Sequence, residues 1–189
     1  MTRFCLIRHG QTDWNLEGRY QGQGDVPLNE TGRAQAWALA ETLKGQTFAA
    51  IYSSDLKRAK ETADIVAAML HMPVRLDRRL REINQGEWEG QLVDVIRDRY
   101  NEIWQQRKAD PESVSAPGGE TVGQVAARVR EALCEIAHLY PDSPVLIASH
   151  GLALATAICK VRGIPLGRAY DAIPDNAEPV WVDWDDGGC

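Results

Sequence analysis

The sequence predicts an α/β fold, with a mostly parallel sheet flanked by helices on both faces. Two patterns lead to this fold class. Short apolar runs of strand length alternate along the chain with longer runs of helical periodicity, and the short runs are typical of strands buried on both faces. The length of 189 residues, 44% of them hydrophobic, suits one core, so residues 1–189 are expected to form a single domain.

The strands are expected where short apolar runs end in polar or glycine-containing turns. Arg3–Ile7, Ala49–Ser53 and Val145–Ser149 meet this description. A weaker strand is expected at Val74–Leu76, and Val180–Trp184 is expected to add a last one.

The helices are expected between these strands, where apolar residues recur at helical spacing behind capping residues. Their ranges are 32–44 with Gly45 as the C-cap, 56–69 behind Ser54 and Asp55, 92–104, 121–139 behind Gly118 and Gly119, and 152–161. Two long segments without periodicity remain, Arg8–Glu30 and Arg107–Gly119. Because loops of this length in a compact domain are usually functional, we expect a lid within 91–119.

Charge and hydropathy exclude several classes of partner. The chain has 21 Lys and Arg against 27 Asp and Glu, a net charge of -6, which counts against a nucleic-acid or anionic membrane surface. The apolar start is interrupted by Arg8 and His9, too early for a signal peptide, and no apolar run is long enough for a membrane span. We therefore expect a cytoplasmic protein that binds neither nucleic acid nor membrane. The sequence leaves its oligomeric state open, a homodimer included.

The four cysteines are Cys5, Cys134, Cys159 and Cys189. They are scattered, form no CxxC pair and have no His at metal-binding spacing. Reduced, mostly buried thiols are therefore expected.

Charged and imidazole side chains follow the predicted strands. Arg8 and His9 follow the first strand, Arg58 comes soon after the second, Glu82 follows the weaker strand, and His150 follows Val145–Ser149. Ligands of open α/β sheets bind outside the carboxyl ends of the strands. The sequence therefore predicts that two His, two Arg and one Glu converge at one edge of the sheet.

Together these residue types suit phosphoryl chemistry. Arginine forks match phosphate oxygens, and the start of the helix after Gly151 is expected to offer unpaired N–H groups to the same anion. A neutral imidazole attacks phosphorus when its other ring nitrogen is held as a donor, a task that the Gly10 carbonyl could perform. Glu82 is the candidate to protonate the leaving oxygen and later to deprotonate water.

The sequence resembles the histidine phosphatase superfamily, the phosphoglycerate-mutase-like proteins. The resemblance covers nearly the whole chain in order. It is carried by the segments Leu6–Asn15 with its Arg-His-Gly motif, Tyr20–Gly22, Asp25–Leu28, Thr31–Gly32, Tyr52–Ala59, Leu80–Ile83, Gly86–Gly90, Pro117–Thr121 and Ser149–Gly151.

The resemblance implies a three-layer sandwich and a role for each matching residue. His9 would be the nucleophile that is transiently phosphorylated, and Glu82 the proton donor. The residues that it assigns to the phosphoryl group are Arg8, Arg58 and His150, with Asn15 and Gln21 as further donors, and Gly22 and Gly151 complete the substrate-binding set. No cofactor and no catalytic metal are expected, because phosphoryl transfer in this family depends on positioning and charge.

Within the family the sequence favours the phosphatases. The stretch 91–116 is shorter than the substrate-binding insertion of phosphoglycerate mutases, Leu152 stands where mutases tend to have Asn, and Gln21-Gly22 is similar to the phosphatases. We therefore expect a metal-independent phosphomonoesterase of a small phosphorylated metabolite, such as phosphoserine, α-ribazole 5′-phosphate or a sugar phosphate. The alternatives are a cofactor-dependent phosphoglycerate mutase and an inactive module that binds a phospholigand or a protein.

Other candidates compete with these assignments. Glu87 and Glu89 lie in the same region as Glu82. His71 and His138 lack any motif and are expected at the surface or at helix ends. Trp104, Arg107 and Lys108 are candidates for the substrate entrance, with core packing as the alternative for Trp104.

Overall fold

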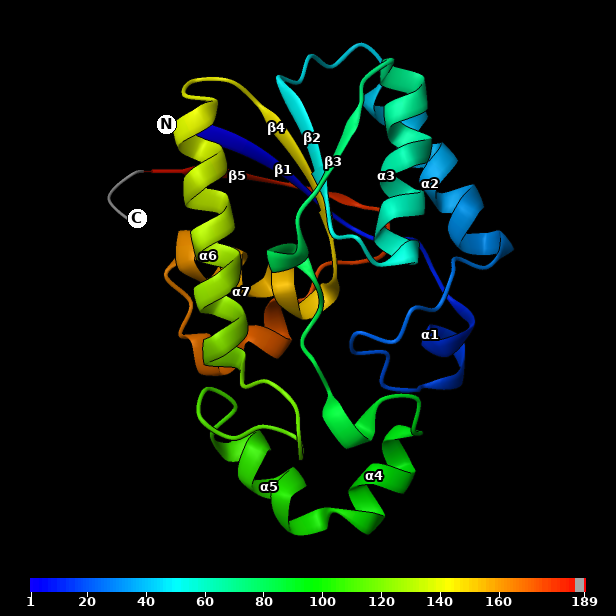
Figure 1. Ribbon diagram of the computed structural model, residues 1–189, viewed down its shortest axis with the longest axis vertical. Coiled ribbons are helices and arrows are strands. Elements are labelled where there is room, and N and C mark those ends of the chain that lie inside the picture. Colours follow the sequence, from blue (N-terminus) through cyan, green and yellow to red (C-terminus); the bar gives the residue numbers. More distant parts are fainter. Residues whose placement is uncertain (186–188) are drawn as a thin grey trace.

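The structure, a computed structural model, describes residues 1–185 and 189 (Figure 1). Its sheet has five strands in the order β3-β2-β4-β1-β5. They are β1 (Thr2–Arg8), β2 (Ala50–Ser53), β3 (Val74–Leu76), β4 (Val145–Ser149) and β5 (Pro179–Trp184). The first four are parallel and β5 pairs antiparallel with β1, so the predicted mostly parallel α/β sheet is confirmed.

Helices cover both faces of the sheet (Figure 1). Helices α2 (Glu30–Leu43) and α3 (Lys57–Leu70) cover one face, and α6 (Val122–Leu139) and α7 (Gly151–Arg162) the other. Successive residues of a strand point to opposite faces. Phe4 and Leu6 therefore pack with α6 and α7, whereas Cys5 and Ile7 pack with α2 and α3, which explains why β1 is apolar throughout.

Capping residues set the ends of the helices. The Asn29 side chain accepts a hydrogen bond from Gly32 N, so α2 begins two residues earlier than expected. Thr121 forms a capping box with Gln124 at the start of α6. The expected C-cap at Gly45 is wrong by one residue: Lys44 is the cap and Gly45 follows it with φ +85°.

The expected helix 92–104 is two helices, α4 (Val93–Arg99) and α5 (Asn101–Ala109), and α5 extends into the expected loop. The break is at Tyr100, which has non-helical backbone angles and a ring packed against Trp88. Trp88, Ile96 and Ala116 form a separate small core there, with Trp104 packed against it. Figure 1 shows α4 and α5 beyond the carboxyl ends of the strands, where a lid was expected.

Four short helical segments complete the described part of the chain. The loop Arg8–Glu30 contains α1 (Asp13–Glu17), which begins with a Thr12–Asn15 capping box. The 3-10 segments are η1 (Arg78–Leu80), η2 (Gly86–Trp88) and η3 (Leu166–Ala172). In the part of the chain that the structure describes, every helix is too short or too polar to cross a membrane.

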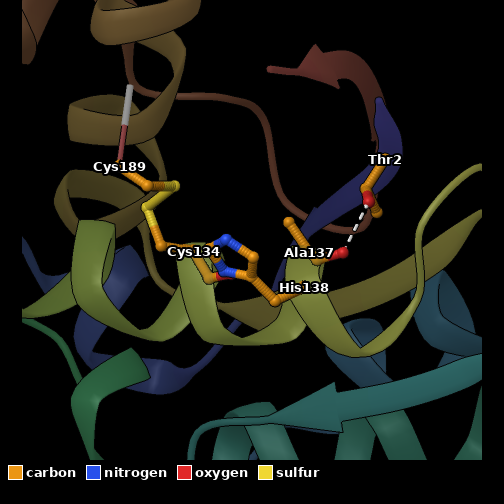
Figure 2. Close-up of a disulfide and its surroundings, with 5 residues drawn as sticks. All are labelled: Thr2, Cys134, Ala137, His138 and Cys189. Atoms are coloured by element: carbon orange, nitrogen blue, oxygen red, sulfur yellow. Dashed lines mark hydrogen bonds between the residues drawn. A yellow bond between two sulfur atoms is a disulfide. The ribbon is translucent and has the colours of Figure 1, made fainter. Parts of the chain in front are cut away.

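The expectation of four reduced cysteines is wrong for two of them. Cys134 on α6 and Cys189 form a disulfide (Figure 2). Cys5 and Cys159 are buried thiols. The pair is 55 residues apart in the sequence, and only the fold brings the end of the chain to α6. Thr2 at the start of β1 also bonds to this helix, since its hydroxyl donates to Ala137 O at 3.1 Å.

Breaking this disulfide is expected to lower the free energy of unfolding by about 2–4 kcal/mol, because the bond removes entropy from the unfolded chain. Chemical unfolding of the wild type with and without a reductant measures the loss. Cys134→Ser is the matched control, since it should show the lower stability under both conditions. Equal stability of the oxidised and reduced wild type would contradict the prediction.

Candidate active site

A pocket of about 160 Å³ lies at the carboxyl ends of the parallel strands. Its lining residues are Arg8, His9, Asn15, Arg19, Tyr20, Gln21, Gly22, Arg58, Glu82, Ile83, Gln85, Gly151, Leu152, Tyr170 and Ile173. His150 lies behind this wall, fully buried, with its ring centroid 5.2 Å from that of His9. The structure therefore brings together every residue of the predicted site. We call this space the catalytic pocket.

His9 is held by its backbone and by one ring nitrogen. Its N–H donates to Ser149 O at 3.0 Å, and its carbonyl accepts from Asn176 at 2.7 Å. Its Nδ1 donates to the Gly10 carbonyl at 2.7 Å, as the sequence predicted, which leaves the lone pair on Nε2. Position 10 needs glycine because a Cβ there would lie 2.4 Å from Gly32 O.

Burial lowers the pKa of His9 well below its usual value, and the nearby Arg58 guanidinium lowers it further. The imidazole is therefore neutral at pH 7. Arg58 Nε donates to His9 Nε2 at 3.2 Å, which confirms that Nε2 is the acceptor nitrogen. The ring thus has the neutral tautomer that a nucleophile requires.

Arg58 is fully buried in the first turn of α3, where the helix dipole disfavours a cation. Two loop carbonyls compensate: Nη1 donates to Gly24 O and Nη2 to Gly22 O, both at 2.7 Å. Burial lowers the pKa of Arg58 to about 10, so the side chain remains charged at neutral pH. Arg58 therefore fixes the loop after β1 to α3 while its charge faces His9.

Arg8 and His150 each keep a buried polar atom without a partner among the described residues, Arg8 Nε and His150 Nδ1. Arg8 is anchored by Nη1, which donates to Pro174 O at 3.0 Å, and His150 by Nε2, which hydrogen-bonds with Ser54 Oγ at 2.8 Å. Burial and then Arg58 lower the pKa of His150 well below its usual value. Both side chains are suited to an anion in the catalytic pocket.

The N–H groups at the start of α7 are used differently from the expectation. Leu152 N and Ala153 N both donate to the Glu82 carboxylate at 3.1 Å, and Ile83 N donates to it at 2.9 Å. These N–H groups are therefore paired with the protein's own carboxylate and are not free for a substrate anion. The loop after η1 brings Glu82 into this position. Position 151 suits glycine, because a Cβ there would lie only 3.0 Å from the Ile173 side chain.

The three other predicted substrate contacts, Asn15, Gln21 and Gly22, have different hydrogen-bond partners. Asn15 Oδ1 accepts from the Thr12 N–H and hydroxyl, both at 3.0 Å, so its amide nitrogen is the group left for the pocket. Gln21 has a buried Oε1 without a donor among residues 1–185 and 189. Gly22 has φ +49° and contributes its carbonyl to Arg58.

The competing carboxylates lie outside the catalytic pocket. Glu89 Oε1 accepts from Gln23 N and Gln85 N at 2.7 and 3.1 Å, a structural task. Glu87 is exposed and hydrogen-bonds with the Tyr100 hydroxyl. His71 and His138 are at the surface as expected. Among the described residues, no group of His, Cys, Asp and Glu side chains is arranged to hold a metal ion.

Arg128 on α6 was missed by the sequence reasoning. It donates to the carbonyls of Arg79, Arg81 and Glu82 at 2.8, 2.5 and 2.9 Å. Its Nε and Nη2 bind the Glu120 carboxylate at 2.9 Å, which helps to lower the pKa of Glu120 against the effect of burial. In the sequence, Arg128 is simply an arginine next to the apolar positions of a helix. That pattern does not reveal its bond to the Glu82 carbonyl, 46 residues away.

The two buried histidines should make stability depend on pH. Their pKa values lie below the ordinary value of about 6.5, so below that pH the unfolded chain binds protons that the folded protein excludes. We expect the free energy of unfolding to fall between about pH 6.5 and pH 5, by up to roughly 1.4 kcal/mol per pH unit for each histidine.

Urea unfolding across this range is the measurement, with His150→Gln expected to reduce the slope. The control is His138→Gln, which changes an exposed histidine and should keep the slope of the wild type. An unchanged slope in His150→Gln would count against the assignment.

Comparison with known proteins agrees with this geometry. The family model of the histidine phosphatase superfamily (branch 1) matches residues 4–189. Phosphoserine phosphatase 1 of Hydrogenobacter thermophilus is 34% identical over 177 residues, 94% of this chain and 84% of that protein. A probable phosphoglycerate mutase, GpmB, of Salmonella choleraesuis is 36% identical over 166 residues, 87% of this chain and 77% of that protein.

A solved structure is also similar throughout. A mycobacterial glucosyl-3-phosphoglycerate phosphatase in complex with VO3 aligns with a TM-score of 0.89 at 33% identity, over 98% of this chain and 94% of that one. With a family model that spans nearly all of its residues, this chain belongs to the histidine phosphatase superfamily.

Proposed function

We propose that the protein is a phosphomonoesterase of a small phosphorylated metabolite, and that the phosphoryl group passes through His9 on its way to water. The observation that carries the proposal is the state of the His9 ring. It is buried and neutral, Gly10 holds its Nδ1, and its unprotonated Nε2 accepts a hydrogen bond from Arg58 at the wall of the catalytic pocket. The phosphatases among its relatives support the same reaction.

The phosphoryl group binds among the cations and donors of the pocket. Arg8 Nε and His150 Nδ1 are buried donors without partners among residues 1–185 and 189, so a phosphoryl oxygen would satisfy them. Arg58 offers its charge and exchanges its bond to His9 Nε2 for one to a phosphoryl oxygen. Asn15 and Gln21 add amide groups at the pocket wall. These groups stabilise the charge that develops in the transition state.

In the first step His9 Nε2 attacks phosphorus in line with the ester bond. The P–N bond forms, the P–O bond to the alcohol breaks, and Glu82 acts as the general acid that delivers a proton to the leaving oxygen. In the second step water attacks the phosphohistidine and the Glu82 carboxylate takes a proton from it. The P–N bond breaks, phosphate leaves, and His9 and Glu82 return to their initial states.

Assays of phosphate release test this function. The enzyme is expected to hydrolyse p-nitrophenyl phosphate, and at least one member of a panel of phosphorylated metabolites, in the presence of EDTA. Acid-labile phosphoenzyme should be trapped during turnover. Loss of activity in EDTA would overturn a metal-independent reaction, and no release of phosphate from any substrate would overturn the phosphatase function.

A mutase is the second candidate, since some relatives are named probable phosphoglycerate mutases. It would return the phosphoryl group from His9 to the substrate. Incubation with 3-phosphoglycerate, primed with 2,3-bisphosphoglycerate, separates the two. Release of phosphate without isomerisation is the expected result, and isomerisation faster than hydrolysis would make the protein a mutase.

A further inference from the structure

A second pocket lies beside the catalytic pocket. Its volume is about 360 Å³, and Tyr20 and Tyr170 line both spaces. Its lining residues are Tyr20, Trp104, Arg107, Lys108, Pro111, Gly167, Arg168, Tyr170 and Asp171, which come mainly from α5 and η3. We call it the side pocket. The catalytic pocket is smaller, at about 160 Å³, so the side pocket offers the larger space for the alcohol part of a substrate.

Arg107 is the buried cation of the side pocket, with 4% of its surface exposed. Its guanidinium stacks on the Trp88 ring at 5.1 Å, and Nη1 donates to Gln85 Oε1 at 2.8 Å. Gln85 itself lines the catalytic pocket. The remaining edge of the guanidinium, Nε and Nη2, is buried and lies near the neutral Tyr170 phenol, but among residues 1–185 and 189 it has no hydrogen bond of regular geometry.

The same edge of other arginines in this protein binds a carboxylate. Nε and Nη2 of Arg81 bind the two oxygens of Asp55 at 2.6 Å each. In Arg128 they bind the two oxygens of Glu120 at 2.9 Å each. Planar two-point pairing with a carboxylate is the strongest use of this edge. Arg107 therefore has the group that a carboxylate would complete, and no carboxylate of the described chain completes it.

The charges around the side pocket also favour an anion. Arg168 and Asp171 pair with each other at 3.0 Å, so their charges cancel. Lys108 adds a second cation beside Arg107. Burial raises the pKa of Tyr170 to about 12, so its phenol is neutral and does not act as a counter-ion for the neighbouring Arg107. The wall of the side pocket thus has a net positive charge.

We propose that the side pocket binds the alcohol part of the substrate and recognises a carboxylate on it through Arg107 and Lys108. This inference rests on the proposed phosphatase function, and the substrate class is the phosphate monoesters of hydroxy acids and hydroxy amino acids. Tyr170 and Tyr20 line both pockets, so the side pocket adjoins the site of the phosphoryl group. The phosphoryl group and the carboxylate then occupy the two pockets together.

A pair of matched substrates tests this proposal: 3-phosphoglycerate, which carries a carboxylate, and glycerol 3-phosphate, which has a hydroxymethyl group in its place. The measured quantity is the ratio of their kcat/KM values. The wild type is expected to prefer 3-phosphoglycerate, and Arg107→Gln to lower the ratio roughly 10- to 100-fold, the value of a charged hydrogen bond. Lys108→Gln, at an exposed position where folding is not at risk, should lower it by several fold.

The control is Arg162→Gln, which removes an exposed cation from the end of α7, outside both pockets, and should keep the ratio of the wild type. A purely structural role of Arg107 would lower both kcat/KM values and leave their ratio unchanged, which would overturn the proposal. So would a wild type that hydrolyses both substrates equally well, although the phosphatase function would then stand. If p-nitrophenyl phosphate and both substrates are all left intact, the phosphatase function itself fails and this inference fails with it.

Discussion

Replacing His9 by alanine is expected to lower kcat for phosphate release by roughly 10³- to 10⁶-fold, the cost of losing the nucleophile of a covalent mechanism. The variant keeps Arg8, Arg58, His150 and Glu82, so it should still bind phosphate. We expect none of them to replace the unprotonated Nε2 of His9, since His150 is fully buried behind the wall of the catalytic pocket and its Nε2 is hydrogen-bonded with Ser54. Initial rates with p-nitrophenyl phosphate measure the loss, and acid-labile phosphoenzyme should be absent.

The matched control is His138→Ala. His138 is exposed on α6, where its Nδ1 donates to the Cys134 carbonyl of the preceding turn, and it contributes nothing to either pocket. This variant should keep the activity of the wild type. Phosphoenzyme formation by His9→Ala at the normal rate would show that another group is the nucleophile, and His150 would then be the next residue to test.

Local patterns were sufficient to predict the strands. Val74–Leu76 and Val145–Ser149 are found at the predicted residues, and β1 is longer than its apolar run by one residue at each end. Val145–Ser149 and the centre of β1 are apolar runs that a polar or glycine-containing turn ends, so the signal for these strands lies within a few adjacent residues. The break at Tyr100 and the Cys134–Cys189 disulfide depend on packing between distant segments. No local pattern contains that information.

The site residues could also be predicted from local sequence, whereas the contacts that hold them could not. His9, Glu82 and His150 were predicted because each follows a parallel strand, and parallel strands end at one edge of a sheet. The contacts that hold Glu82 were not predicted: two N–H groups of α7 bind its carboxylate, and Arg128 binds the carbonyls around it. The position of a residue after a parallel strand predicts that its side chain reaches the shared edge of the sheet. The hydrogen-bond partners of a loop residue depend on the path of the loop in three dimensions.

The contacts around Glu82 make its own substitution informative. Arg128 fixes the backbone of residues 79–82, and Leu152 N and Ala153 N orient the carboxylate toward the catalytic pocket. Glutamine has nearly the same shape, and its amide oxygen can accept one of these hydrogen bonds. Glu82→Gln should therefore fold normally while it loses the ability to give or take a proton.

Glu82→Gln is expected to slow the hydrolysis of alkyl phosphates by roughly 10²- to 10⁴-fold, the usual value of general acid–base catalysis. With p-nitrophenyl phosphate the leaving group departs without a proton, so phosphorylation of His9 stays fast while water attack, which needs the base, becomes slow. The variant should thus release one p-nitrophenolate per enzyme in a burst and then turn over slowly. Stopped-flow absorbance measures the burst, with Glu87→Gln, at an exposed glutamate outside the catalytic pocket, as the control. An equal loss for alkyl and nitrophenyl esters without a burst would mean that Glu82 acts through its charge or its structure, because only a proton donor and acceptor makes the effect depend on the leaving group.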